Sequence, residues 1–167
     1  MIAILTDYMI YIKTMLLVAF LVSASAYDVE TRKIPNRLVL AGLIVGALTN
    51  ATSLKSFFLA FIPVIILFLL AICGLMFILG SGDIKVLMVM FLFTGVTETL
   101  MSLFIACVLF IIFSLIKNKN AAAIMLSKLP LIGKTENADI NAAYPFCPFL
   151  LSGYMIYLGV MAFEALI

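Results

Sequence analysis

Histidine and tryptophan are absent from this chain of 167 residues, and cysteine occurs only three times, with no CxxC pair. Without histidine the chain cannot build a Ser-His-Asp or Cys-His catalytic centre. Histidine and cysteine also supply most protein ligands of transition metals. No phosphate-binding loop or dinucleotide fingerprint is present either. The sequence therefore predicts neither a metal site nor a cofactor.

Charge is scarce as well. Charged residues make up 11% of the chain and hydrophobic residues 66%, whereas a soluble domain carries about 25% charged residues. The net charge of +2 gives no basic surface of the kind that binds nucleic acid. These absences predict an integral membrane protein, surrounded by membrane lipid and without a nucleic-acid partner.

Stretches without any charge divide the chain into candidate membrane spans. They cover residues 14–27, 38–54, 56–82, 86–97, 99–116 and 140–163. A helix needs about 20 apolar residues to cross a bilayer, a length that the first stretch reaches if it starts near Ile4 and includes Lys13. The second and fourth are short, but neighbouring helices can cover the ends of a short span. We therefore predict an all-α, polytopic membrane helix bundle with about six transmembrane helices, forming a single domain over residues 1–167.

Lysine and arginine give this bundle an orientation. With six spans and the amino terminus outside, the inner side holds Arg32, Lys33, Arg37, Lys85, Lys117, Lys119, Lys128 and Lys134. The outer side keeps only Lys55, with Lys13 in the outer half of the first helix. Because positive charge accumulates on the cytoplasmic side, we expect a multi-pass protein of the inner, or cytoplasmic, membrane. The loops at residues 28–37 and 80–85 then face the cytoplasm.

Asp83 follows two glycines, Gly80 and Gly82, at the start of the fourth predicted span. An aspartate in this position is typical of a helix N-cap, because its carboxylate accepts hydrogen bonds from free backbone N–H groups. A catalytic role is the alternative, and both can hold together. Lys85 reads as an interfacial charge.

Asp28 lies near the end of the first predicted helix, where the helix dipole is unfavourable for an anion. An ion pair with Arg32 or Lys33, one turn further on, would explain it without any function. A functional role explains it equally well. Because both aspartates fall at the same predicted membrane face, they can be neighbours in a bundle.

Prolines mark two helix starts. Pro35 and Asn36 follow Lys33, so the first helix must end by Lys33 and the next can begin at the proline. Pro145 and Pro148 similarly begin the last span. Read alone, Pro35 is first of all structural, whereas Pro145 and Pro148 are explained as well by this role as by a function.

Three segments together resemble the type IV prepilin leader peptidases, which are membrane aspartyl proteases of the GxGD class. The segments read D-V-E-T-R-K-I-P-N over residues 28–36, G-S-G-D-I-K over residues 80–85 and Y-P-F-C-P-F-L-L-S-G over residues 144–153. The resemblance implies that Asp28 and Asp83 are the catalytic pair. It implies supporting roles for the motif residues Gly80, Gly82, Lys85, Pro35, Asn36, Pro145 and Pro148.

The resemblance also implies a substrate, the amino-terminal leader of a pilin or pseudopilin precursor, cut at the cytoplasmic membrane face. Larger members carry an additional N-methyltransferase region with paired CxxC motifs, and we expect no such region or zinc domain here. The compact form is similar to the stand-alone peptidases of tight-adherence (Tad, Flp) pilus systems. Archaeal preflagellin peptidases share the core, so the substrate stays open between the two, as does the oligomeric state.

The rival interpretation is a non-enzymatic subunit of a secretion or pilus system, or a proton-coupled transporter, because membrane carboxylates also relay protons. Two aspartates at one face, instead of a chain of them across the bilayer, favour the peptidase. For a peptidase, the helix ends suggest how the pair divides its work. Asp83, at a helix amino terminus, is expected to stay ionised as the base, and Asp28 to hold the proton.

Overall fold

The computed structural model describes residues 2–50, 54–72, 81–117 and 144–164. All regular structure in these ranges is helical. The helices are α1 (Ile2–Thr31), α2 (Asn36–Asn50), α3 (Leu54–Ile72), α4 (Ser81–Thr94), α5 (Val96–Lys117) and α7 (Cys147–Glu164). By length and composition, α1, α5 and α7 are able to cross a membrane. The predicted all-α membrane helix bundle is confirmed.

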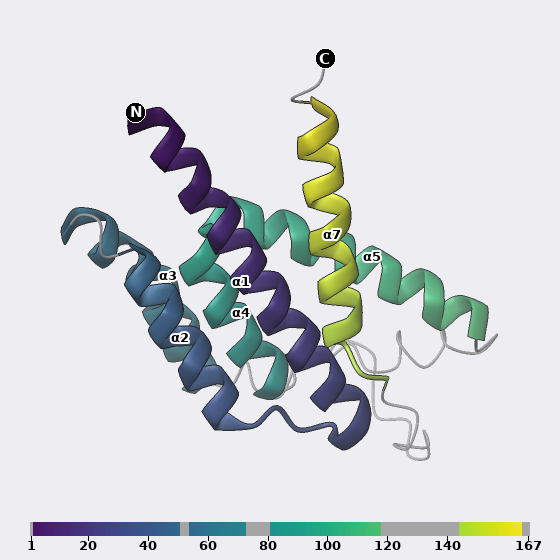
Figure 1. Ribbon diagram of the computed structural model, residues 1–167. Helices are drawn as coiled ribbons and strands as arrows, with labels where there is room; N and C mark the ends of the chain where they lie inside the picture. The colour runs from purple at the N-terminus through teal and green to yellow at the C-terminus, as the bar shows by residue number, and fades with distance from the viewer. Residues whose placement is uncertain (1, 51–53, 73–80, 118–143, 165–167) are drawn as a thin grey trace.

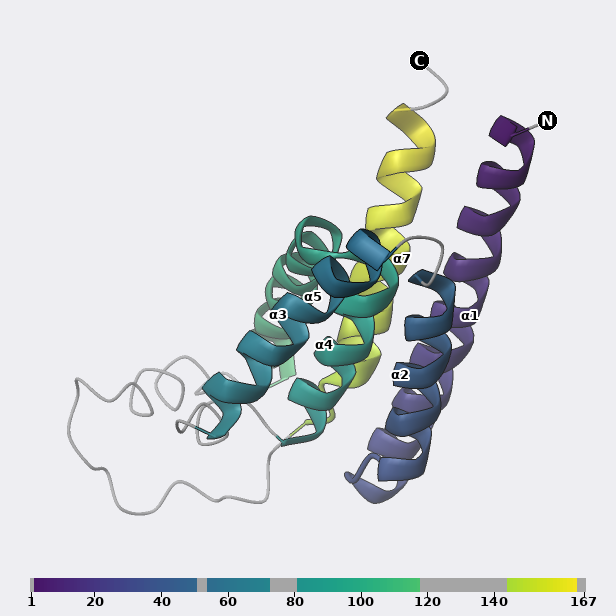
Figure 2. The same ribbon diagram turned by 90° about the vertical axis from the view of Figure 1, so that its left-hand side faces the viewer.

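The helices gather around α4, which contacts α1, α2, α3 and α5. Helices α1 and α2 run side by side in opposite directions, and α5 is steeply inclined to α1 and α7 (Figures 1 and 2). The end of α1 and the starts of α2, α4 and α7 share one end of the bundle (Figure 1). The amino terminus of α1 and the carboxyl end of α7 project at the opposite end.

Helix α4 is the centre of the core. Nine of its fourteen residues are buried hydrophobic side chains, namely all those from Ile84 to Phe93 except Lys85. Val86, Val89 and Met90 are fully covered. A helix that is apolar on every side is stable where other helices surround it. The short fourth span of the sequence prediction is therefore covered by protein on most of its surface.

The break between α1 and α2 falls where proline predicted it. Helix α1 ends at Thr31, and Arg32 takes a left-handed conformation with φ of 53°. The carbonyl oxygen of Pro35 then accepts hydrogen bonds from the N–H groups of Leu38 and Val39, at 3.0 and 3.3 Å. Pro35 thus begins the first turn of α2, where its missing N–H costs nothing.

The break between α4 and α5 differs from the prediction, which divided these spans at Glu98. The chain turns at Gly95, with φ of +85°, and α5 already begins at Val96. Glycine accepts this left-handed conformation without the steric cost that a side chain adds. Glu98 therefore lies in the first turn of α5.

Helices α5 and α7 cross at very short distance. A Cβ atom at Gly153 would lie 2.5 Å from the carbonyl oxygen of Ser102 and 2.9 Å from the backbone nitrogen of Ala106. Small residues at such a crossing let two helix backbones approach closely inside a membrane. This contact fixes α7 against α5. It thereby helps to set the position in space of the first residues of α7.

Candidate active site

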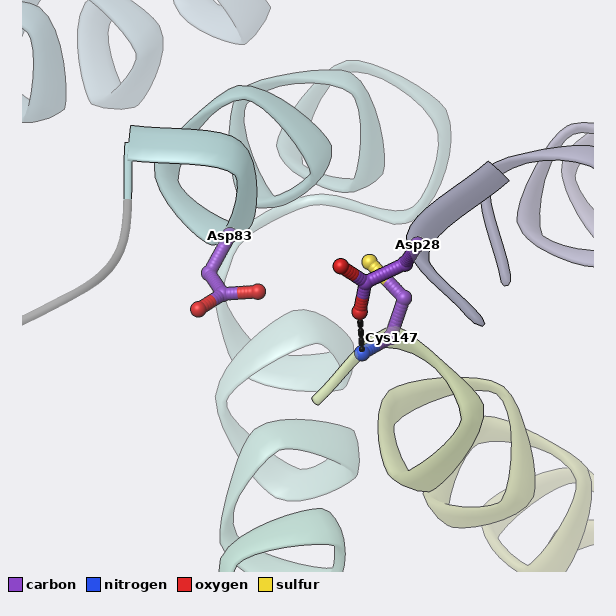
Figure 3. A group of neighbouring side chains, drawn as sticks. All are labelled: Asp28, Asp83 and Cys147. Carbon is purple, nitrogen blue, oxygen red and sulfur yellow. Dashed lines mark hydrogen bonds between the residues drawn. The ribbon is translucent and has the colours of Figure 1, made fainter. Parts of the chain in front are cut away.

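The two predicted catalytic aspartates meet at one end of the bundle. Asp28 comes from the last turn of α1 and Asp83 from the first turn of α4. Figure 3 shows the two carboxyl groups turned toward each other, and one oxygen of each lies within 4.8 Å of the other. Both side chains are partly accessible. Residues 55 positions apart in the sequence therefore form one pair that solvent or a substrate can reach.

Asp28 is held by a third helix. Its Oδ2 atom accepts a hydrogen bond of 3.0 Å from the backbone N–H of Cys147, the first residue of α7 (Figure 3). The first N–H groups of a helix have no partner within that helix, and they carry the positive end of its dipole. The Asp28 carboxylate thus caps α7 from another helix, and this N–H group stabilises negative charge on Asp28. In the described part of the chain, no ion pair joins Asp28 to Arg32 or Lys33.

Asp83 is placed differently from the predicted N-cap. Helix α4 begins at Ser81, so Asp83 lies inside its first turn. Asp83 precedes the charge-free part of α4 and lies outside the three helices able to cross a membrane. Burial, followed by the nearby negative charge of Asp28, raises the pKa of Asp83 to about 6. Both causes favour the protonated form of Asp83.

The first two motifs are in direct contact. The Nζ atom of Lys85 donates a hydrogen bond of 2.7 Å to Oδ1 of Asn36, which joins α4 to the start of α2. A Cβ atom at Gly82 would lie 3.3 Å from the Cδ1 atom of Ile34, so the glycine lets the start of α4 lie close to the α1–α2 turn. These two contacts keep the helix ends that carry Asp28 and Asp83 together. Gly80 lies outside the described residues.

Aromatic side chains hold the third motif in place. Phe110 of α5 packs edge-to-face against Phe146 and Phe149, with ring centroids 5.7 and 5.3 Å apart. The Lys117 ammonium lies 4.8 Å from the ring centroid of Tyr144. Such ring contacts stabilise by about 0.5–1.5 kcal/mol beyond the area that they bury. They anchor the segment that leads into α7, and with it the Cys147 N–H group that donates a hydrogen bond to Asp28.

The prolines of this motif keep their predicted structural place. Pro145 precedes α7, and Pro148 is its second residue. Proline in the first turn leaves no extra N–H group to satisfy.

Cys147 is the neighbour that sequence reasoning missed. Its side chain is fully buried, and its Sγ atom lies within 4.8 Å of an oxygen of each aspartate. The signal was its place between the two prolines of the third motif. Asp28, Asp83 and Cys147 are the kinds of residue that ligate metals, so this trio is where the described residues could hold a metal ion. The sequence prediction of no metal site stays a prediction.

The sequence pattern of the type IV leader peptidase family matches residues 15–115, which is more than half of the chain. The chain belongs to the type IV leader peptidase family. It is therefore a protease of a membrane family, and the matched segment contains both aspartates but ends before α7. No curated protein and no solved structure matches the chain.

Proposed function

We propose that this leader peptidase is a membrane-embedded aspartyl endopeptidase that removes the amino-terminal leader of type IV pilin-like precursors, with Asp28 and Asp83 as its catalytic pair. The observation that carries the proposal is the approach of these two carboxyl groups, from α1 and α4, to within 4.8 Å. A single water molecule can hydrogen-bond to two oxygens that are up to about 5 Å apart. Aspartyl proteolysis needs such a water between one carboxylate and one carboxylic acid.

The surroundings of the pair support the opposite division of roles to the one expected from the helix ends. Asp28, which accepts the Cys147 N–H, is the ionised base and removes a proton from the attacking water. Asp83, whose pKa is raised to about 6, is the acid and donates its proton to the scissile carbonyl oxygen. Because the two carboxyl groups interact, they titrate as a unit.

The attack forms a tetrahedral diol in which the former carbonyl carbon is bonded to the water oxygen and still to the leaving nitrogen. Asp28 then returns its proton to that nitrogen, and Asp83 takes back a proton from the diol. The C–N bond breaks to give a carboxyl group on the leader and a free amine on the mature protein. The pair returns to its starting protonation state, as a catalyst must.

The placement of the pair at a helix-end face, together with the predicted excess of lysine and arginine there, supports a cytoplasmic active site in the inner membrane. Lys119, Lys128 and Lys134 lie outside the described residues. Contacts that link the six described helices support an assignment of residues 1–167 to a single integral-membrane peptidase domain. Gly82, Lys85, Pro35, Asn36, Pro145 and Pro148 have supporting roles in this proposal, and so does Gly80.

The test is cleavage of a co-expressed pilin precursor by wild type, Asp28→Asn and Asp83→Asn, followed as a gel shift. Each variant keeps the shape of the side chain and loses proton transfer, so cleavage should fall by at least about 100-fold. Glu30→Gln is the matched control, because Glu30 is an exposed acid two residues from Asp28. Normal cleavage by both aspartate variants at equal membrane levels would contradict the proposal and favour an assembly subunit.

The substrate class is tested with the same strains. A Tad-type Flp pilin precursor, a larger type IV pilin precursor and an archaeal preflagellin are each co-expressed with wild type. The compact architecture leads us to expect the fastest cleavage with the Flp precursor. A clear preference for preflagellin would assign the protein to the neighbouring peptidase group and leave the catalytic pair unchanged.

A further inference from the structure

The end of the bundle opposite the aspartates contains a second polar site. Helix α4 has 14 residues, which makes it about 21 Å long, whereas the hydrocarbon core of a bilayer is roughly 30 Å thick. If Asp83 lies at one membrane boundary, as the proposed function requires, the turn at Gly95 lies inside the opposite half of the bilayer. Helices α1 and α7 project beyond that turn (Figure 1).

A break in the helix at membrane depth requires polar groups around it, because exposed backbone is not tolerated in lipid. The turn has them. The Thr94 hydroxyl donates to the carbonyl oxygen of Met90 at 3.0 Å, and the hydroxyls of Thr94 and Thr99 lie 2.9 Å apart. The Thr99 hydroxyl also contacts the carbonyl oxygen of Gly95 at 2.7 Å. These bonds give the turn polar partners from within the protein.

Beside the turn lies a cavity of about 320 Å³, lined by α1, the end of α4, the start of α5, and α7. This volume is within the range of cavities that hold small molecules or parts of larger ones. Its polar lining consists of Lys13, Thr14, Thr94, Glu98, Tyr154 and Tyr157, and the rest is apolar. A cation and an anion inside a membrane-spanning bundle are expensive, so they indicate a function. None of these residues belongs to the catalytic pair or its motifs.

We propose that this cavity binds the zwitterionic headgroup of a phospholipid, with phosphatidylethanolamine as the fitting class. Lys13 binds the phosphate, and Glu98 binds the ammonium group, which also faces the tyrosine rings. The cation and anion together are neutral, which matches a headgroup without net charge. The apolar part of the lining, which includes Ile10, Leu158 and Met161, continues toward the lipid and accepts the first acyl carbons.

The experiment measures lipid adducts on the purified full chain by native mass spectrometry, with phosphatidylethanolamine, phosphatidylglycerol or soluble phosphoethanolamine added. Wild type should retain one phosphatidylethanolamine. Lys13→Met should weaken that binding by at least about tenfold, because it removes the partner of the phosphate. Glu98→Gln should reverse the preference toward the anionic phosphatidylglycerol. Lys117→Met on α5 and Glu164→Gln on α7 are the controls, since both side chains are exposed and neither lines the cavity.

Lys13→Arg keeps the positive charge and should still bind phosphatidylethanolamine. This variant therefore distinguishes loss of the binding site from loss of the fold. Equal phosphatidylethanolamine binding by wild type, Lys13→Met and Glu98→Gln would overturn the proposal, and so would a wild-type preference for phosphatidylglycerol. Displacement of the lipid by an equal concentration of phosphoethanolamine would contradict the proposal that the bound headgroup belongs to a phospholipid. The readout requires no cleavage. Failure of this site would therefore leave the proposed peptidase untouched, and failure of the peptidase would leave this binding measurable.

Discussion

The carboxyl end of α1 and the amino end of α4 carry the same kind of residue in opposite electrostatic positions. If only the dipole of its own helix acted on each side chain, Asp28 would be the less stable anion and Asp83 the more stable one. In the folded protein the contacts of the two carboxyl groups favour the reverse order. Asp28 accepts an N–H group from the start of α7, whereas burial and the charge of Asp28 raise the pKa of Asp83 to about 6.

This reversal shows that a helix end acts on whichever charge the fold brings to it. The dipole effect falls off within one turn and is modest, about 0.3–1 kcal/mol at an exposed site. A direct hydrogen bond to a carboxylate contributes about 1.5–3 kcal/mol. One N–H group from α7 is therefore large enough to offset the unfavourable end of α1. At Asp83, burial and the charge of Asp28 outweigh the favourable start of α4.

The largest effect is expected in the pH dependence of cleavage, which tests this difference between the two aspartates. If Asp83 must be protonated, kcat/KM should approach a tenfold fall for each pH unit above its pKa, which gives about a 50-fold fall between pH 6 and pH 8. A purified enzyme and a pilin-leader peptide give this profile. A rate that rises through pH 6 and then stays level to pH 8 would mean that Asp83 acts as the base and that the sequence-based assignment was correct.

The next effect should come from moving α7. Gly153→Ala places a Cβ atom against the backbone of Ser102 and Ala106, which should cost roughly 1–3 kcal/mol of stability and shift the N–H group away from Asp28. Gly159→Ala, on the same helix with nothing within 4 Å of its added Cβ atom, is the control. Melting temperature and cleavage rate should both fall for Gly153→Ala only. Equal behaviour of the two variants would mean that the α5–α7 crossing does not position the site.

A smaller effect is expected of Asp83→Asn on the stability of the folded protein. Its folded-state pKa lies above the ordinary value of 3.8, so its contribution to stability is present below pH 3.8 and is lost as the pH rises through about 6. Asp83→Asn removes that loss and should raise stability by roughly 1–3 kcal/mol at pH 7.5. The gain should vanish near pH 4 in thermal melts of the two proteins. A gain that is the same at both pH values would point to packing instead of ionisation.

The smallest expected effect concerns the metal-ligand trio. Because aspartyl proteolysis needs no metal, EDTA should leave cleavage unchanged, and Cys147→Ser should keep most of the activity while retaining the backbone N–H. Strong inhibition by EDTA that added Zn²⁺ reverses, together with loss of activity in Cys147→Ser, would instead identify a metal ion bound by Asp28, Asp83 and Cys147.

Much of the architecture was readable from composition and from a few positions. The charge-free stretches predicted the helices, Pro35 predicted the break after α1, and the motifs predicted that Asp28 and Asp83 belong together. The prediction missed the break at Gly95 because it divided the apolar stretches at a charge, Glu98. Gly95, three residues earlier, takes the left-handed backbone conformation that the turn needs. A charge in a membrane chain marks a polar environment, whereas the turn itself follows backbone freedom.

By itself, the sequence determined that this is a helical membrane bundle with two aspartates at helix ends, because hydrophobic length, proline and charge act locally. Only the tertiary structure decided that α4 is the central helix, since helices that are apolar on every side carry no mark of which neighbour they face. Tertiary structure alone also decided that the N–H of Cys147 meets Asp28, that Asp83 has the raised pKa, and that Lys13 and Glu98 share a cavity. Each of these depends on groups brought together from distant parts of the chain, and Coulomb and hydrogen-bond energies depend on that distance in space.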